Sequence, residues 1–283
     1  MKKDHQLDLF YDFKPKAPAK PSNNSQNKKS AHKKKKKKKN TKTHKFVKFI
    51  ILLGLFIGGI LSILLSPLFD IKEITVENNE QIGTEQIVNL SRIEIGNNMF
   101  KINKMESIKN IKTNAYIDNV KIKRKLPDKI VLYIEERHAT FQVEIGTGYA
   151  YMNNQGYILE FSDTKIEVPI IEGITENIEV GNRIIDNDLQ KLEQVLKIVK
   201  AASSKKIANL ISKIDITNKD EYILVLETEG KTAYIGDVSN IDTKMAYIKD
   251  CIEREKDKKG KIFVNVDLNK KKDPYFREEW FYE

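Results

Sequence analysis

Few residues in this chain have the type and spacing that catalysis or metal binding requires. Of the four histidines only His138 lies outside the lysine-rich N-terminal region, and Cys251 is the single cysteine. An internal disulfide and a Cys/His metal site are therefore ruled out. The neighbouring acids Glu135 and Glu136 lie in a predicted strand, where they point to opposite faces and cannot share a proton. The sequence also lacks the G-x-S-x-G, H-E-x-x-H and P-loop motifs. We predict no catalytic, cofactor-binding or metal-binding residues, and interpret His138 as a surface residue and Cys251 as a core residue.

The clearest element that the sequence predicts is a membrane-spanning helix. Residues 49–69 contain no charged side chain, and about 20 apolar residues are enough to cross a bilayer. Lys42, Lys45 and Lys48 precede this segment, and flanking lysines mark the cytoplasmic side. We therefore expect a single-pass type II membrane protein with a cytoplasmic N-terminus and with residues 70–283 outside. A cleaved signal peptide would have a shorter apolar region and a small-x-small cleavage site, which this segment lacks.

The basic character of the chain is concentrated at its N-terminus. Residues 1–48 hold 17 lysines and three acidic residues, a net charge of +14, so the remainder carries −4 given the overall +10. Such a tail cannot bury an apolar core, and we predict that it is disordered. Its lysines set the topology and keep the tail solvated, or bind anionic lipid headgroups. Nucleic-acid binding is disfavoured, because no aromatic platform or folded reader accompanies the lysines.

Residues 70–138 predict a small sheet with two helices. A strand at about 69–76 is followed by helices capped by Thr84 and Asn103, which are residue types favoured at helix N-termini. Two strands near 120–124 and 130–136 then alternate apolar and polar residues, joined by a turn that contains proline. The order strand, helix, helix, strand, strand predicts an α+β domain with both helices on one face of the sheet.

Four segments form this order of elements: FDIKEITVENN, TEQIVNL, GNNMFKIN and IDNVKIKRKLPDKIVLYIEER. Together they resemble the POTRA domain of the FtsQ/DivIB family of bacterial cell-division proteins. Its sharper features are an R-x-x-P-x-x-[IL] spacing that begins at Arg124 and the closing pair Glu136-Arg137. Ala139 departs from the family, which commonly has proline there. From the residues alone, Arg124 and Glu136 are expected to face each other across the hairpin without any chemical role.

Residues 139–268 predict a second domain, a mixed α/β sheet. A hairpin is expected around the turn 153–156, and helices are expected from Asp188, as a cap, and from about Asp242. The segments NNQGYIL, VPIIEG, IDITNKDEYILVLETEGKTAYIGD and FVNVDLN resemble the β domain of the same family.

The chain as a whole is thus predicted to have an α+β architecture in five parts. These are a basic disordered tail (1–48), a transmembrane helix (49–69), a POTRA-like βααββ domain (70–138), a β domain (139–268), and a C-terminal edge strand and tail (269–283).

The resemblance implies a divisome scaffold without enzymatic activity. It implies binding to FtsL-like and FtsB/DivIC-like single-pass proteins outside the membrane at the division septum, and through them an indirect link to the septal peptidoglycan synthase. In the family the partner pairs with the sheet edge near the C-terminus, which corresponds here to about 273–280. Since aromatic residues dominate interface energetics, the residues assigned to partner binding are Tyr275, Phe276, Arg277 and Trp280. The alternative is that these aromatic residues only close the core of the β domain.

Two other functions remain open at this stage. A POTRA-bearing assembly or transport accessory protein would need a membrane barrel or repeated POTRA units, and the sequence predicts neither. A membrane-anchored cell-wall enzyme would need catalytic residues, which the sequence does not display.

Overall fold

The computed structural model describes residues 41–175, 178–266 and 273–279, so the tail lysines before Thr41 lie outside the described residues. The first element is α1 (Thr41–Leu64). Its Thr43–Leu64 part is long and apolar enough to cross a membrane, although the part after the last lysine, Lys48, covers only residues 49–64. The prediction that the helix continues to residue 69 was wrong. It stops at Leu64, and a separate 3₁₀ turn (Pro67–Phe69) follows, because Pro67 has no N–H to extend the helix.

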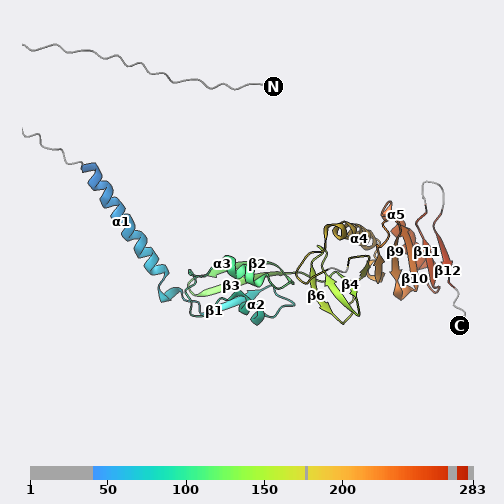
Figure 1. Cartoon of the computed structure of the whole chain (residues 1–283), viewed down its shortest axis with the longest axis horizontal. Helices are drawn as coiled ribbons and strands as arrows, with labels where there is room; N and C mark the ends of the chain where they lie inside the picture. The colour runs from blue at the N-terminus through green and yellow to red at the C-terminus, as the bar shows by residue number, and fades with distance from the viewer. Residues whose placement is uncertain (1–40, 176–177, 267–272, 280–283) are drawn as a thin grey trace, which may run out of the picture. The chain divides into compact units, whose positions relative to one another are not determined.

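A compact unit begins at Phe56 and contains two sheets. The first sheet combines β1 (Glu73–Glu77), β2 (Ile117–Lys125) and β3 (Lys129–Glu136) with α2 (Thr84–Ser91) and α3 (Lys104–Ile111). The strand order is β1-β3-β2, with β1 parallel and β2 antiparallel to the central β3. The predicted βααββ order is confirmed, and Figure 1 shows it along the chain.

The core of this first part lies between the sheet and the two helices. Ile130 and Leu132 of β3 and Ile87 of α2 are all fully buried in one cluster with Ile111 of α3. Asn103 caps α3 as predicted, since its side chain accepts a hydrogen bond from the N–H of Glu106. The prediction for Thr84 was wrong: Gly83 holds the N-cap position, and Thr84 is already the first helical residue.

The second sheet has nine strands in the order β12-β11-β10-β9-β8-β7-β4-β5-β6. The hairpin predicted around 153–156 is present, with β5 and β6 as its antiparallel arms. β12 forms one edge of the sheet and β6 forms the other. The bounds of the strands are β4 (Phe141–Ile145), β5 (Gly148–Met152), β6 (Ile158–Ser162), β7 (Ile170–Glu172), β8 (Lys213–Asp215), β9 (Tyr222–Leu226), β10 (Lys231–Gly236), β11 (Gly260–Phe263) and β12 (Tyr275–Glu278). Short 3₁₀ turns lie at Ala208–Leu210 and Glu227–Glu229.

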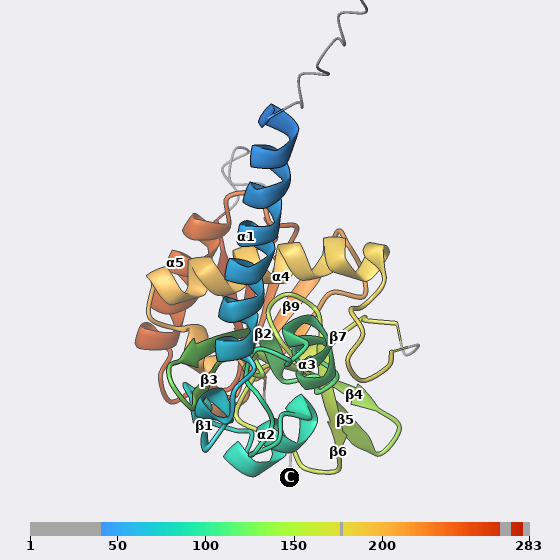
Figure 2. The same cartoon turned by 90° about the vertical axis from the view of Figure 1, so that its left-hand side faces the viewer.

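Two helices, α4 (Asp186–Ser204) and α5 (Ile241–Arg254), cover one face of this sheet. They contact each other, and Figure 2 shows both. Their inward residues share a buried cluster with the row of strand residues Ile214, Leu224, Ala233 and Ile262, which are in register across β8 to β11. Asp188 does not cap α4 as predicted. The helix begins two residues earlier, and Asp188 lies buried in its first turn.

Candidate functional site: the free sheet edge at β12

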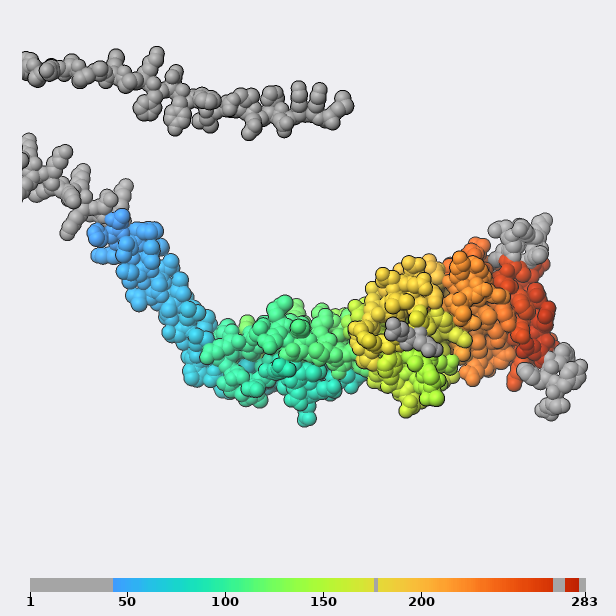
Figure 3. Space-filling view, viewed as in Figure 1, coloured from blue at the N-terminus to red at the C-terminus, as the bar shows by residue number. Residues whose placement is uncertain are grey.

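The edge of the larger sheet is formed by β12, which follows β11 and β10 in order. β12 pairs antiparallel with β11, so that Phe276 lies opposite Ile262 and Tyr275 lies opposite Phe263. No strand in the described part of the chain lies on the other side of β12. In Figure 3 its red atoms are exposed on the face shown. An unpaired edge strand offers its backbone N–H and C=O groups to another chain.

The backbone groups that face outward follow from the register. The N–H of Glu279 donates to the carbonyl of Lys259 over 3.0 Å, which makes these two residues a hydrogen-bonded pair. In an antiparallel ladder such pairs alternate with non-hydrogen-bonded ones. Arg277 and Tyr275 therefore also direct their backbone groups to β11. Phe276 and Glu278 direct theirs away from the sheet, and they are the residues with which an added strand would pair.

An aromatic ladder crosses the sheet on the face opposite the helices. The rings of Tyr234 and Phe263 stack with centroids 4.9 Å apart, and those of Phe263 and Tyr275 stack at 4.7 Å. The Arg277 guanidinium lies over the Phe263 ring at 5.4 Å. Offset stacking of this kind adds about 0.5–1.5 kcal/mol per pair beyond the area buried. Tyr275 remains 47% exposed at the outer end of the ladder.

Phe276 lies on the other face of β12. It is half-buried and packs against the core cluster that the two helices cover. The close approach of β12 to β11 depends on Gly260, where an added Cβ would clash with the carbonyl oxygen of Arg277 and lie 2.8 Å from the Phe276 ring. Glycine is thus required at this position by space, because any side chain would push β12 away.

The predicted site residues are therefore divided between two faces. Tyr275 and Arg277 belong to the aromatic face, and Phe276 belongs to the core face. Trp280 lies outside the described residues. The prediction missed Tyr234 and Phe263, which extend the aromatic surface across two further strands. The alternation of these residues with apolar neighbours in β10 and β11 was visible in the sequence. The contact between the rings depends on the register of the two strands, which the sequence does not give.

The predicted lysine flank lies within α1 rather than ahead of it. Lys42 is in the first turn of the helix, and Lys45 and Lys48 are exposed further along it. This arrangement keeps positive charge at the N-terminal end of the candidate span.

The two residues considered for catalysis, Cys251 and His138, lie in different environments. Cys251 is buried on α5, and burial raises the pKa of its thiol above the usual value, which keeps it protonated. His138 lies in the connection between β3 and β4 and is exposed, as predicted. Within the described ranges no group of three His, Cys, Asp or Glu residues is placed to hold a metal ion.

The charged residues of the hairpin motif bind backbone groups instead of each other. Arg124 lies opposite Ile130, and its Nε donates to the carbonyl of Met99 over 2.8 Å. Glu136 lies opposite Ile117 and accepts hydrogen bonds from the N–H groups of residues 81 and 82. The predicted pairing of Arg124 with Glu136 was wrong, since the register places them at different ends of the hairpin.

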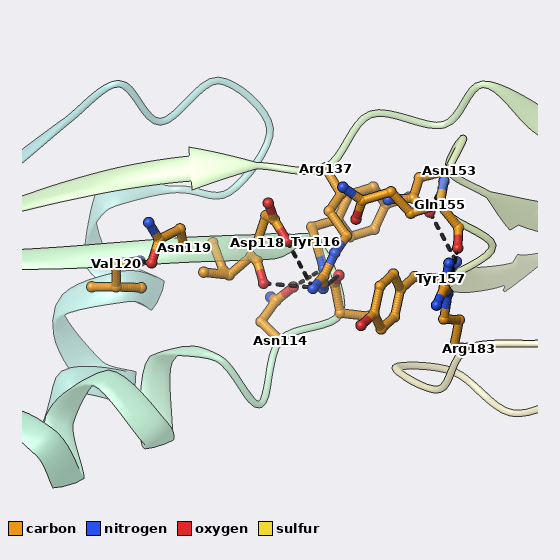
Figure 4. Close-up of polar contacts among 12 residues, drawn as sticks. Asn114, Tyr116, Asp118, Asn119, Val120, Arg137, Asn153, Gln155, Tyr157 and Arg183 are labelled. Carbon is orange, nitrogen blue, oxygen red and sulfur yellow. Dashed lines mark hydrogen bonds and ion pairs between the residues drawn. The ribbon is translucent and has the colours of Figure 1, made fainter.

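Arg137 connects the end of the first sheet to the start of the second. Its guanidinium donates to the carbonyls of Ala115 and Ile117, pairs with Asp118 at 3.0 Å, and lies 4.1 Å from the centroid of the Tyr157 ring. Figure 4 shows this arrangement.

A second polar contact lies in the same region. Burial raises the pKa of the Tyr116 phenol, and its hydrogen bond to Glu160 adds to the effect. The phenol therefore stays protonated and continues to donate to this carboxylate across the ordinary pH range.

Comparison with known proteins identifies these two parts. A family model described as POTRA domain, FtsQ-type matches residues 69–137, and one described as FtsQ/DivIB, C-terminal related matches residues 139–271. The cell division protein DivIB of Clostridium acetobutylicum is 32% identical over 211 residues, which cover 72% of this chain and 82% of that protein. The chain belongs to the FtsQ/DivIB family.

Other members of the family are similar over smaller parts. The cell division protein DivIB of Clostridium tetani is 32% identical over 184 residues, covering 63% of this chain and 68% of that protein. The cell division protein FtsQ of Syntrophotalea carbinolica is 29% identical over 146 residues, half of each chain. The predicted family and the predicted α+β fold are both confirmed.

Proposed function

We propose that this protein is a non-enzymatic scaffold of the cell-division machinery that binds a partner strand along β12. The names of its relatives support a role in cell division. The partners proposed are FtsL-like and FtsB/DivIC-like single-pass proteins, through which the scaffold would act on the septal peptidoglycan synthase. The free edge of β12, with outward backbone groups at Phe276 and Glu278, is the observation that carries this proposal.

Strand addition fits the chemistry of this edge. Backbone hydrogen bonds supply affinity in such complexes, and pockets for alternate side chains supply specificity. A strand added to β12 would extend the aromatic face past Tyr275 and the core face past Phe276. The Lys261–Glu279 ion pair, at 2.6 Å, neutralises two charges on the aromatic face next to Arg277. These features favour a partner with apolar or aromatic side chains.

The protein is proposed to reach this partner from a single membrane anchor. α1 would span the membrane with the lysine-rich N-terminus in the cytoplasm, which places both sheets outside, at the division septum. The positive flank at Lys45 and Lys48 supports this orientation. The lysine tail is proposed to contact anionic lipid at the inner surface.

The edge proposal is tested by one backbone substitution and its matched control. Glu278→Pro removes a single outward N–H and leaves the hydrogen bonds to β11 in place, and edge strands tolerate proline. Glu278→Ala removes the carboxylate and keeps the N–H. We expect Glu278→Pro to weaken binding of the purified FtsB/DivIC-like partner by at least about tenfold, the equivalent of 1.4 kcal/mol. Glu278→Ala should bind as the unaltered protein does. Binding is measured by calorimetry on the full chain in nanodiscs.

Two outcomes would contradict the proposal. Wild-type affinity in Glu278→Pro would show that the partner does not pair with this edge. Equal weakening in both variants would show that the carboxylate makes the contact and that strand addition does not occur here.

A further inference from the structure

The C-terminal end of α1 is hydrogen-bonded to the loop between α2 and α3 of the first sheet domain. Asn98 is buried, and its side-chain amide donates to the carbonyl oxygens of Leu64 and Ser66, at 3.0 and 3.2 Å. The last carbonyls of a helix have no partner within the helix, and Asn98 supplies one here. The backbone continues the connection, since Ile71 donates to Asn97 and Gly96 donates to Ile71. Residues 92–99 are therefore held beside the point where α1 leaves the membrane.

Three large apolar side chains are exposed at this junction. Leu65, Leu68 and Ile95 are 49%, 59% and 67% exposed, and we call them the juxtamembrane patch. Ile95 precedes Gly96, whose N–H donates to Ile71, so the loop and the segment after α1 are directly linked. Nothing in the described part of the chain covers these side chains. A soluble protein rarely groups exposed large apolar residues without an interaction partner.

The length of α1 indicates what covers the patch. From the end of the lysine flank to Leu64 the helix contains sixteen residues, which rise about 24 Å. The hydrocarbon core is roughly 30 Å thick. If Lys48 lies at the inner boundary, about 6 Å of hydrocarbon lies beyond Leu64. Leu65 and Leu68 fall in this depth, and the hydrogen bonds described above bring Ile95 close to it.

The charges around the patch indicate the kind of lipid contact. A cleft of about 690 Å³ opens beside it, lined by two basic residues, Arg92 and Lys101, and by three acidic ones, Asp70, Glu94 and Glu106. This near balance gives no preference for anionic headgroups. The contact is therefore apolar, and it should form in zwitterionic lipid and persist at high salt.

We infer that the juxtamembrane patch inserts into the outer leaflet, so that the first sheet domain has a lipid contact of its own beside α1. This inference rests on the membrane anchoring proposed above and is independent of the partner edge at β12. If so, the first sheet domain contacts the membrane surface through the loop that contains Ile95. The same loop binds the C-terminal end of α1 through Asn98.

The test places an environment-sensitive fluorophore at single cysteines of the full chain, in a Cys251→Ala background. The chain is reconstituted in phosphatidylcholine nanodiscs that contain doxyl-labelled lipid. Ile95→Cys is the test position, Leu55→Cys within α1 reports the anchor, and Ile185→Cys is the matched exposed isoleucine outside the patch. We expect a blue shift and quenching at positions 55 and 95, and neither at position 185. High salt should leave all three unchanged.

The outcomes separate this inference from the anchoring on which it rests. Quenching at position 55 with solvent-like emission at position 95 would overturn the inference and leave the anchor intact. Solvent-like emission at all three positions would overturn the anchor itself. Loss of quenching at position 95 in high salt would show that the contact of the juxtamembrane patch with lipid is electrostatic, which would overturn the inference of an apolar contact. If Ile95→Cys does not fold, Leu68→Cys provides the same measurement.

Discussion

The charged residues of the POTRA hairpin hold loops in place by binding their backbone groups. Arg124 fixes the segment before α3 through Met99, and Glu136 fixes the segment before α2 through two N–H groups. Their spacing was visible in the sequence, but their partners were not. The partners are main-chain atoms of loops, and their positions depend on how the helices pack on the sheet. Two opposite charges in a hairpin are therefore poor evidence for an ion pair until the register of the two strands is known.

Asp188 provides a residue-scale test of the second domain. Burial opposes its charge, but a hydrogen bond from the Thr175 N–H and the ion pair with Lys191 at 3.0 Å outweigh it, so the pKa of Asp188 lies below its usual value. Because the pKa of Asp188 is lower in the folded chain than in the unfolded chain, its charge stabilises the fold. This stabilisation is fully present above the pKa of the unfolded chain, about 3.9. This stability is lost as the pH falls through the folded value.

We predict that Asp188→Asn lowers the free energy of unfolding at neutral pH by about 1.5–3 kcal/mol, the range for hydrogen bonds to charged groups. The difference between the two proteins should shrink as the pH falls below about 4, where Asp188 takes up a proton in the unfolded chain before it does so in the folded one. Urea unfolding of the full chain in micelles, followed by circular dichroism, measures both. A difference that stays constant down to pH values well below the unfolded pKa would show that the carboxylate charge contributes nothing.

At the scale of elements, the edge strand depends on one glycine in its neighbour. A methyl group at Gly260 would meet the backbone of β12 at Arg277, which cannot shift without breaking the ladder. We predict that Gly260→Ala detaches β12 from β11 and leaves the helix-covered core folded. Hydrogen exchange read by mass spectrometry should show lost protection in 273–279, including the Glu279 amide that bonds Lys259. Protection in α4 should remain.

Gly83→Ala is the matched control, because nothing lies within 4 Å of the added carbon and its φ is −61°. It should leave the exchange of β12 unchanged. Unaltered protection of 273–279 in Gly260→Ala would contradict the proposed role of this close approach.

The order of the elements could be predicted from the sequence, but several of their ends could not. Alternating apolar residues and turn residues located β2, β3, β5 and β9, and helical spacing located α5. The errors were at helix starts, where Gly83 and Ile185 hold the N-cap positions although Thr84 and Asp188 are residue types favoured there. The aromatic ladder was not predictable, since it joins three strands whose register is set by tertiary pairing.

For the whole molecule, the distribution of charge agrees with a membrane-anchored architecture. The net +14 of residues 1–48 and the −4 of the remainder lie on either side of the apolar part of α1. The first sheet domain follows directly after the anchor and is bound to its end by Asn98. The edge proposed for partner binding is formed by a strand near the other end of the chain.

The role of this protein in cell division is tested by imaging dividing cells. The full chain with a fluorescent protein fused to its N-terminus is imaged together with a membrane dye through a division cycle. We predict a band of fluorescence at midcell that appears before constriction begins. Uniform membrane fluorescence throughout division would contradict it.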